Sequence, residues 1–370
     1  MFGELIEGLA SMIYVVVCAV VGFSLSYVWI ARILKWTRRR GILDIPNARS
    51  SHAVPTPRGA GIAIVGLTIG FWLVYLLVAH RFDSRFLAFA AGGLMVATVG
   101  WLDDVATAGR SARFIVHSLA ASMAMLAFGY FDEIVVPFVG TIYFSWFGIP
   151  LTLLWIAGLT NSYNFIDGID GSAGGQAVVA GAGWVILCGM INYPEIGILG
   201  VLAASCSLGF LMYNWPPARI FMGDVGSSFL GYTFAVIPLM CRGASPAIPF
   251  AAVLIVWPSV FDSCFTIIRR AKNGENILVA HRSFLFQRLN IAGWSHLQAT
   301  LLYSMLEAIG VVMAWMWTSN PDLRNYVVGI AMMLCAGLWT LTIMKEKTLK
   351  LRNKEGTLSP SARNGVYVVK

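Results

Sequence analysis

Residues 161 to 191 read NSYNFIDGIDGSAGGQAVVAGAGWVILCGMI, a polar, glycine-rich stretch followed by an apolar run. The apolar half carries no charged residue, and about 20 such residues are enough for a helix to cross a hydrocarbon core about 30 Å thick. Further apolar runs alternate with charged or Gly/Pro/Asn-rich breaks, at 9–34, 59–79, 86–102, 114–130, 146–160, 196–213, 226–241, 247–268, 296–317 and 326–344. The pattern predicts an all-α, polytopic membrane protein with about 11 transmembrane helices.

The composition leaves no room for a sizeable soluble domain. Of 370 residues, 58% are hydrophobic and 12% are charged, and the mean hydropathy is +0.74. Soluble proteins carry about 25% charged residues. We therefore expect a single polytopic transmembrane domain over 1–344 and a basic, flexible cytoplasmic tail over 345–370, near anionic lipid. The six cysteines are scattered through apolar runs without disulfide or metal-ligand spacing, so we interpret them as packing residues.

The basic residues indicate the orientation of the chain. Of the 26 Lys and Arg residues, 21 lie in alternate breaks, at 35–58, 103–113, 161–171, 214–225, 269–295 and 345–370. Under the positive-inside rule these breaks face the cytoplasm, so the N-terminus is expected outside and the C-terminus inside. The net charge of +8 is thereby explained without nucleic acid as a partner. The run at 146–160 is the shortest, and a bent or partly re-entrant helix is the alternative there.

Acidic and amide residues concentrate in breaks that this orientation assigns to one face. One series repeats every three residues: Asn161, Asn164, Asp167 and Asp170. A helical turn would bring neighbours in this series together, and their oxygen atoms suit a hard cation such as magnesium. The alternative is Asx and glycine turn chemistry joining two spans. That alternative explains the Gly and Asn residues but not four oxygen-bearing side chains at one spacing.

Other charged residues on this face extend the pattern. Asp103 and Asp104 end an apolar run, where ionised groups are costly unless solvated, paired or bound to metal; a solvated helix end is the alternative. Asp224 precedes an apolar run, where it could cap the helix or complete a magnesium shell, and phosphate could use the N–H groups of this helix start. Singly, the basic residues here are more often topology markers than ligands. Together with magnesium, these basic residues suit a pyrophosphate-containing substrate. The basic residues are Arg58, Arg110, Arg113, Arg219, His281 and Arg282.

Five motifs follow one another on this face: LDIPNARSSHAVPTPRGAG (43–61), GWLDD (100–104), NSYNFIDGIDG (161–171), FMGDVGS (221–227) and AHRS (280–283). In these motifs the chain resembles the polyprenyl-phosphate N-acetylhexosamine-1-phosphate transferases, bacterial enzymes that start O-antigen, enterobacterial common antigen and peptidoglycan lipid intermediates. The similarity runs from about Leu43 to Leu289. It implies a catalytic domain over 1–344 in the bacterial inner membrane, with the active site on the cytoplasmic face.

The resemblance also implies roles for individual residues. Asp103 and Asp104 form the acidic pair that acts on the lipid phosphate, and Asp167 either orients a substrate or takes part in catalysis directly. Magnesium, with manganese as the alternative, is bound by Asp224 and Asn164. The substrate-binding set consists of Phe221 on the uracil, Asp170 near the uridine, Arg113, His281 and Arg282 on the diphosphate and sugar, together with Asn161 and Arg58.

One departure from the family concerns the stretch after the ninth apolar run. Many relatives carry a His-x-His-His cluster there, whereas this chain has Phe284-Leu285-Phe286-Gln287. The difference argues against a catalytic histidine downstream of Ser283. It also disfavours the peptidoglycan branch and favours the branch that initiates O-antigen in lipopolysaccharide biosynthesis.

The implied reaction joins undecaprenyl phosphate to the sugar-bearing phosphorus of a UDP-N-acetylhexosamine, and UMP leaves. The acceptor phosphate is mostly dianionic at neutral pH, because its second pKa is about 6. We therefore favour positioning and electrostatic roles for Asp103 and Asp104 over proton abstraction, with an aspartyl nucleophile as the alternative. The sugar is N-acetylglucosamine, N-acetylfucosamine or N-acetylquinovosamine, which one sequence does not distinguish. A homodimer is expected by analogy alone.

A secondary transporter is the alternative from a different class, because transporters are also polytopic and contain buried acids. Transporters place ionisable groups near the bilayer midplane, whereas most acids in this chain lie at one interface. Asp262 and Glu307 are exceptions, interpreted as helix-packing or lipid-facing residues. The CDP-alcohol transferases are disfavoured because their DGxxARxxN pattern is absent.

Overall fold

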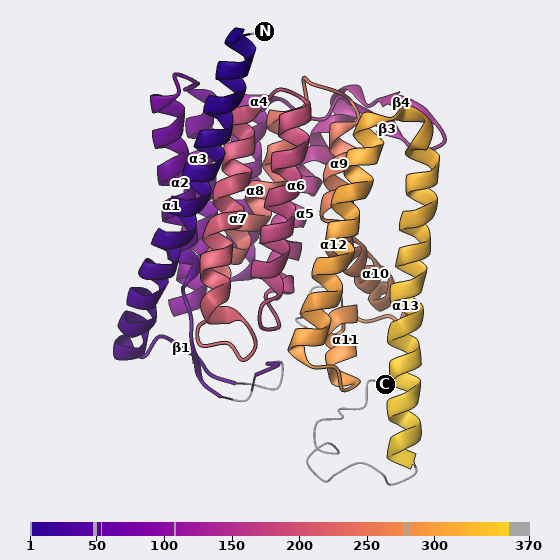
Figure 1. Cartoon of the computed structure of the whole chain (residues 1–370). Coiled ribbons are helices and arrows are strands. Elements are labelled where there is room, and N and C mark those ends of the chain that lie inside the picture. The colour runs from indigo at the N-terminus through magenta and orange to yellow at the C-terminus, as the bar shows by residue number, and fades with distance from the viewer. Residues whose placement is uncertain are drawn as a thin grey trace.

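The computed structural model describes residues 2–46, 50–52, 54–106, 109–276, 279 and 281–354. Long helices form one bundle, and two short antiparallel hairpins lie at its opposite ends (Figure 1). The helices are α1 (Phe2–Arg40), α2 (Gly61–Val78), α3 (Arg85–Ala106), α4 (Arg110–Phe128), α5 (Gly148–Ile166), α6 (Ser172–Met190), α7 (Pro194–Asn214), α8 (Asp224–Met240), α9 (Ile248–Ile255), α10 (Trp257–Lys272), α11 (Leu285–Ile291), α12 (His296–Ser319) and α13 (Arg324–Lys354). The strands are β1 (Leu43–Asp44), β2 (Thr56–Pro57), β3 (Glu133–Val136) and β4 (Gly140–Tyr143).

The apolar runs of the sequence all form helices. Each of the eleven runs overlaps a helix in the described part of the chain, which confirms the prediction of an all-α polytopic protein. Eight of these helices are long and apolar enough by themselves to cross a membrane, and the bent pair α9 and α10 would make a ninth span. The remaining two runs form α5 and α8. The N-terminus and the end of α13 lie at opposite ends of the bundle, as an odd number of crossings requires (Figure 1).

The broken helix is in the ninth run and not in the fifth. The fifth run forms one uninterrupted helix, α5, and its way of crossing the membrane stays a prediction. The ninth run is divided into α9 and α10, which meet at 81°. Pro258 lies in the first turn of α10 and has no N–H with which to continue the hydrogen-bond ladder of α9. The fifth run also contains a proline, Pro150, but it lies in the first turn of α5, where a missing N–H interrupts no preceding helix.

The helical part of the chain extends beyond the predicted boundary at 344. The last helix, α13, continues to Lys354, and residues 345–354 are mostly Lys, Glu, Leu and Arg, which favour helices. Glu346 accepts two hydrogen bonds from the Arg288 guanidinium of α11, at 2.7 Å each. This contact ties α13 to the rest of the protein. The remainder of the predicted tail, 355–370, lies outside the described residues.

The first turn of α8 packs closely against α2 and α3, because glycines remove side chains from both contacts. A Cβ atom on Gly61 of α2 would lie 2.3 Å from the backbone of Gly226 in α8. A Cβ atom on Gly100 of α3 would lie 2.5 Å from the carbonyl oxygen of Asp224. Only glycine permits such an approach of two backbones. The start of α8 is therefore fixed against two neighbouring helices.

We expect Gly61→Ala to lower the free energy of unfolding by about 1–3 kcal/mol, the usual cost of overpacking a core. Gly66→Ala is the matched control on the same helix, since no described atom outside the local helix lies within 4 Å of its added Cβ. Thermal unfolding of the two detergent-purified variants measures the difference. Equal melting temperatures would contradict the close contact between α2 and α8.

Candidate active site

The polar breaks meet at one end of the bundle around a cavity of about 290 Å³. Its walls come from segments that are far apart in the sequence, which confirms that these breaks lie together. The lining residues are Asp44, Ser50, Ser51, His52, Arg58, Asp104, Asn164, Phe165, Asp167, Gly168, Ile169, Asp170, Asn214, Phe221, Gly223, Asp224, Gln287 and His296. The cytoplasmic orientation of this end stays a prediction from the basic residues.

Asp104 holds the start of α8 in place. Its side chain is buried, and its two carboxylate oxygens accept hydrogen bonds from the backbone N–H groups of Asp224 at 3.1 Å and Val225 at 3.3 Å. These are orphan amides of the α8 N-terminus, and a carboxylate there is also favoured by the helix dipole. The cap of α8 is therefore the Asp104 side chain of α3. The sequence had also allowed the Asp224 side chain to cap this helix, and it does not. The Asp224 carboxylate is left to point elsewhere.

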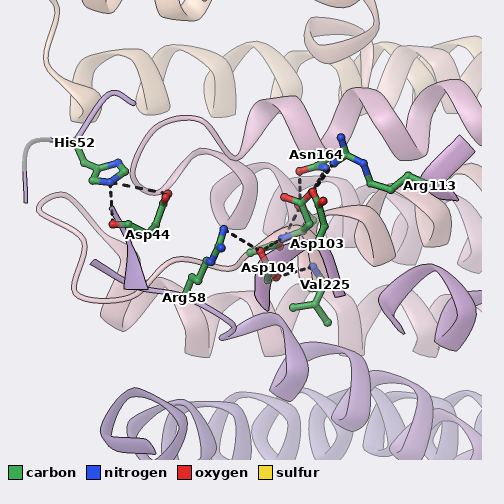
Figure 2. A network of polar contacts seen from close by, with 11 residues as sticks. Asp44, His52, Arg58, Asp103, Asp104, Arg113, Asn164 and Val225 are labelled. Carbon is green, nitrogen blue, oxygen red and sulfur yellow. Dashed lines mark hydrogen bonds and ion pairs between the residues drawn. The ribbon is translucent and has the colours of Figure 1, made fainter. Parts of the chain in front are cut away.

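The Asp224 carboxylate belongs to a polar cluster with Asp103 of α3, Arg113 of α4 and Asn164 of α5, and Figure 2 shows these three side chains close together. Its Oδ2 atom accepts hydrogen bonds from Arg113 Nη1 at 2.6 Å and Asn164 Nδ2 at 2.9 Å. The same Arg113 nitrogen lies 3.0 Å from Asp103 Oδ2. One positive charge thus lies between two carboxylates at the edge of the cavity. Charge-assisted hydrogen bonds of this kind are stronger than neutral ones, so they fix the positions of these side chains relative to one another.

The cluster fits a magnesium ion in the type of its donors. Carboxylate and amide oxygens are hard ligands, and magnesium is commonly bound by one or two carboxylates together with substrate phosphates and water. Within the described residues no group of three or more His, Cys, Asp or Glu side chains could hold a metal by itself. Asn164 donates to Asp224 through Nδ2, and its Oδ1 accepts from Ser227 Oγ at 3.2 Å, so magnesium binding by Asp224 and Asn164 stays a prediction. Arg113 Nη1 contacts Oδ2 of Asp224, one of the two predicted magnesium ligands.

The series Asn161, Asn164, Asp167 and Asp170, at the end of α5 and just after it, contributes three of its four members to the cavity. Asn164, Asp167 and Asp170 line it, whereas Asn161 is exposed and is not among the lining residues that the structure describes. Only Asn161 and Asn164 are on one helix, because α5 ends at Ile166 and Asp167 is already its C-terminal cap. The three residues meet because the chain turns there.

The two aspartates of this turn differ in acidity. Burial raises the pKa of the Asp167 carboxyl well above its usual range, and the charges of Asp224 and Asp104 raise that pKa further. Burial alone would also raise the pKa of Asp170, but hydrogen bonds from His296 and from the Ala218 N–H lower it. Asp170 Oδ2 lies 3.3 Å from His296 Nδ1 and 3.0 Å from the Ala218 nitrogen. Asp170 is therefore favoured as an anion, and Asp167 as a proton-carrying group.

The opposite wall is built on β2 and the chain before α8. The Phe221 N–H donates to the Pro57 carbonyl at 2.8 Å, and Arg58 and Phe221 form a parallel bridge. The Arg58 Nη1 atom lies 3.6 Å from Asp104 Oδ1. The Phe221 ring is 4.9 Å from the His52 ring in an edge arrangement. Figure 2 shows His52 next to Asp44, whose carbonyl oxygen lies 3.4 Å from His52 Nε2. This wall therefore places the aromatic ring of Phe221 near the positive charge of Arg58.

His281 and Arg282 lie near the cavity but do not line it. His281 Nδ1 is 2.9 Å from Ser283 Oγ, and the ring lies 4.9 Å from the Phe284 ring. Burial lowers the pKa of His281 to about 4, and the charges of Arg270 and Arg269 lower it further. The imidazole is therefore neutral near pH 7. Arg282 Nη2 is 3.5 Å from Oγ of Ser51, a residue that does line the cavity.

Among the lining residues that sequence reasoning missed as site residues are Asp44, His52, Asn214, Gln287 and His296. Asp44 and His52 lie inside the quoted motif 43–61, so the motif contained a signal for them. Gln287 lies where the sequence lacks the histidine cluster. His296 begins α12 and has no motif around it, and only folding brings it against Asp170.

The two acids within spans are buried by protein. Asp262 is 2% exposed and accepts hydrogen bonds from the Leu285 N–H at 2.6 Å, the Phe286 N–H at 3.3 Å and the Tyr303 hydroxyl at 2.6 Å. It joins α10 to α11 and α12. Glu307 is 0% exposed, and neither carboxyl oxygen has a hydrogen-bond partner among the described residues. Helix packing is thus the correct alternative for both, and a lipid-facing position is wrong.

The family model and the individual relatives that match this chain agree with each other. The sequence model of glycosyl transferase family 4 matches residues 86–242. The chain is 32% identical over 290 residues to a probable undecaprenyl-phosphate N-acetylglucosaminyl 1-phosphate transferase of Bacillus subtilis (strain 168), covering 75% of this chain and 80% of the relative.

Two further relatives have different printed substrates. A decaprenyl-phosphate N-acetylglucosaminephosphotransferase of Mycolicibacterium smegmatis is 28% identical, over 84% of this chain and 85% of the relative. A phospho-N-acetylmuramoyl-pentapeptide-transferase of Synechococcus sp. is also 28% identical, over 74% of this chain and 82% of the relative. The matched region includes the helices that carry Asp103, Asn164 and Asp224.

Proposed function

Because the chain belongs to glycosyl transferase family 4, the polyprenyl-phosphate sugar-1-phosphate transferases, we propose that it transfers N-acetylhexosamine-1-phosphate from a UDP-sugar to undecaprenyl phosphate and releases UMP. The observation that carries this proposal is the cluster of Asp103, Asp224 and Arg113 beside the cavity. Phosphoryl transfer needs alignment and charge stabilisation more than covalent help from the protein, and such a cluster supplies both.

Asp224 and Asn164 would hold magnesium, or manganese in its place, and the metal supplies positive charge that offsets the charge of the diphosphate. Arg113 and Arg58 add fixed positive charge from α4 and from the residue after β2. Asp104 acts as a positioning residue, because its carboxylate already accepts the first amides of α8. Among the described residues, no backbone N–H group donates to the Asp103 carboxylate. Asp103 is therefore the member of the pair that would face the acceptor phosphate.

The nucleoside would lie on the wall formed by Phe221, with its uracil against the ring and its ribose toward Asp170. An aromatic face provides stacking without requiring charge. Asp170 is favoured as an anion, and a carboxylate accepts hydrogen bonds from sugar hydroxyls. Asp167, which carries its proton more readily, could donate a hydrogen bond to a phosphate oxygen.

The biological step that we propose is the first membrane step of O-antigen assembly on the cytoplasmic face of the inner membrane. Support comes from Phe284-Leu285-Phe286-Gln287, which stands where a histidine cluster is typical of the peptidoglycan branch. Formation of the first peptidoglycan lipid intermediate is the second candidate, because one relative carries a phospho-N-acetylmuramoyl-pentapeptide-transferase name. The two candidates require different UDP-sugars.

The test is release of UMP by the purified protein given undecaprenyl phosphate, magnesium and a panel of UDP-sugars. The panel contains UDP-N-acetylglucosamine, UDP-N-acetylfucosamine, UDP-N-acetylquinovosamine and UDP-N-acetylmuramoyl-pentapeptide. We expect lipid-dependent and metal-dependent release with one of the first three. Release with the pentapeptide substrate alone would transfer the assignment to peptidoglycan synthesis. If well-folded protein released no UMP with any UDP-sugar of the panel, a transporter would be favoured.

A further inference from the structure

His296 lines the cavity and leaves one of its two ring nitrogens open to it. The Nδ1 atom lies 3.3 Å from Asp170 Oδ2, so this nitrogen faces the turn after α5. The Nε2 atom has no hydrogen-bond partner among the described residues, and it is not one of the buried polar atoms that lack a partner there. The side chain is 16% exposed and belongs to the cavity wall. Nε2 is therefore accessible from the cavity.

Asp170 leaves one carboxylate oxygen open beside this nitrogen. Its Oδ2 atom takes both contacts, with His296 Nδ1 and with the Ala218 N–H at 3.0 Å. Its Oδ1 atom has no hydrogen-bond partner within the described part of the chain, and it is not among the buried atoms without one. Asp170 also lines the cavity, with 13% of its side chain exposed. The pair thus presents two neighbouring polar atoms to a ligand.

The carboxylate makes both of these atoms hydrogen-bond acceptors. Asp170 is favoured as an anion and has no proton to give, so the Nδ1–H of His296 donates to its Oδ2. The Asp170 backbone N–H also approaches Nδ1, at 3.4 Å, but an ionised carboxylate is the stronger partner for this nitrogen. An imidazole that carries its single proton on Nδ1 accepts at Nε2. A ligand that satisfies the pair must therefore carry two neighbouring donors.

The start of α12 does not require the His296 side chain. Ser295 caps this helix: its Oγ accepts from the Gln298 N–H at 3.2 Å, and its own N–H donates to Gln298 Oε1 at 3.0 Å. Thr300, one turn further along, donates to the Asp170 carbonyl at 2.8 Å and ties α12 to the turn. The open end of His296 therefore has no structural contact of this kind to make.

Asn214 holds this turn next to the chain that carries Phe221. The Gly171 N–H donates to Asn214 Oδ1 at 2.8 Å. Asn214 Nδ2 donates to the carbonyl of Ile220, the residue before Phe221, at 2.9 Å. Groups that are held in this way bind a ligand without first losing conformational freedom. The acceptors of the Asp170 turn and the aromatic ring of Phe221 are therefore fixed relative to each other.

A ribose carries the two neighbouring donors that the pair requires, in its 2′ and 3′ hydroxyls. Unprotonated phosphate oxygens only accept, and uracil has one N–H donor. Asp170 lies within electrostatic reach of His52, whose ring is 4.9 Å from the Phe221 ring. The pair thus adjoins the aromatic wall, where the nucleoside is expected. An N-acetylhexosamine also has neighbouring hydroxyls, but it follows the diphosphate, which belongs with the acidic cluster.

We propose that His296 Nε2 accepts a hydrogen bond from one ribose hydroxyl of the donor substrate while Asp170 Oδ1 accepts from the other, so that His296 helps to select a ribonucleotide. The proposal deepens the proposed function and rests on it, because it takes a UDP-sugar as the occupant of the cavity. A deoxyribonucleotide lacks one of the two donors and leaves one acceptor unpaired, which costs binding free energy.

The test is calorimetric titration of the full-length protein in detergent, with magnesium, using UMP, 2′-deoxy-UMP and 3′-deoxy-UMP. We expect wild type to bind each deoxy analogue about 10-fold less tightly than UMP, the worth of roughly one hydrogen bond. His296→Asn removes Nε2 but keeps an N–H donor near the place of Nδ1. This variant should bind UMP about 10-fold less tightly and lose the penalty for one hydroxyl while keeping the penalty for the other. Each ratio is measured on one preparation, so partial misfolding does not change it.

Two further variants separate recognition from packing. His296→Gln extends its amide oxygen to about the place of Nε2, so it should recover part of the lost penalty. Thr300→Val is the matched control, because it removes the other contact of α12 with Asp170 and keeps the shape of the side chain. It should keep both penalties of wild type.

Three results would overturn the inference. These are wild type that binds UMP and both deoxy analogues equally, His296→Asn that keeps both penalties, and Thr300→Val that loses the same penalty as His296→Asn. In each of these cases the protein still binds UMP, so the proposed function is retained. Wild-type protein that binds neither UMP nor any UDP-N-acetylhexosamine overturns the proposed function as well.

Discussion

Asp224→Asn is expected to lower the rate of UMP release by about 10²–10³-fold, the usual effect of removing one preorganised charge-stabilising group from an active site. The substitution keeps the size of the side chain but removes the charge that Arg113 contacts at 2.6 Å and that a magnesium ion would use. The backbone N–H of residue 224 still donates to Asp104, so the start of α8 is retained. The loss should therefore appear in catalysis and metal dependence and not in the melting temperature.

Asp132→Asn is the control for this substitution. Asp132 also pairs with an arginine, since Arg242 Nη1 lies 3.0 Å from its Oδ1. That pair lies by the β3–β4 hairpin, at the end of the bundle away from β1 (Figure 1). The control variant should keep wild-type UMP release and the same requirement for magnesium. Wild-type rates in Asp224→Asn would remove Asp224 from the reaction and from the metal site.

Arg113→Gln is expected to have two opposite effects, which separate catalysis from metal binding. The kcat should fall by about 10²-fold or more, because a fixed positive charge beside the diphosphate is lost. The magnesium concentration for half-maximal rate should fall severalfold, because Arg113 Nη1 no longer occupies the space between Asp103 Oδ2 and Asp224 Oδ2. A magnesium titration of UMP release at saturating substrates gives both quantities.

Arg219→Gln removes the same charge without touching the acidic cluster. Arg219 is exposed, stacks on the Tyr213 ring at 5.3 Å and donates to the Met212 carbonyl. We expect both the kcat and the magnesium midpoint of this variant to stay near wild type. A magnesium midpoint in Arg113→Gln equal to that of wild type would show that the guanidinium and the metal do not compete for Asp224.

The sequence predicted which segments form the site but not which partner each side chain contacts. Asp103 and Asp104 are adjacent and read as an equivalent pair, yet the structure directs Asp104 to the amides of α8 and Asp103 to Arg113. Successive residues on a helix point about 100° apart, so neighbours in sequence face different partners. Asn161 was grouped with Asn164 by spacing, but it lies on an exposed face of α5. Spacing alone did not identify which helix face would be covered.

The sequence by itself determined the all-α membrane fold and the gathering of its polar segments at one end. Apolar runs of spanning length must form helices in lipid, because each backbone group needs an internal hydrogen bond there, and alternation of the breaks then brings the motifs to one end. Only the tertiary structure decided that Gln287 and His296 reach the cavity and that the chain breaks between α9 and α10. These features depend on contacts between segments far apart in the chain, such as Asp262 with α11 and Asp170 with α12, which local sequence patterns do not encode.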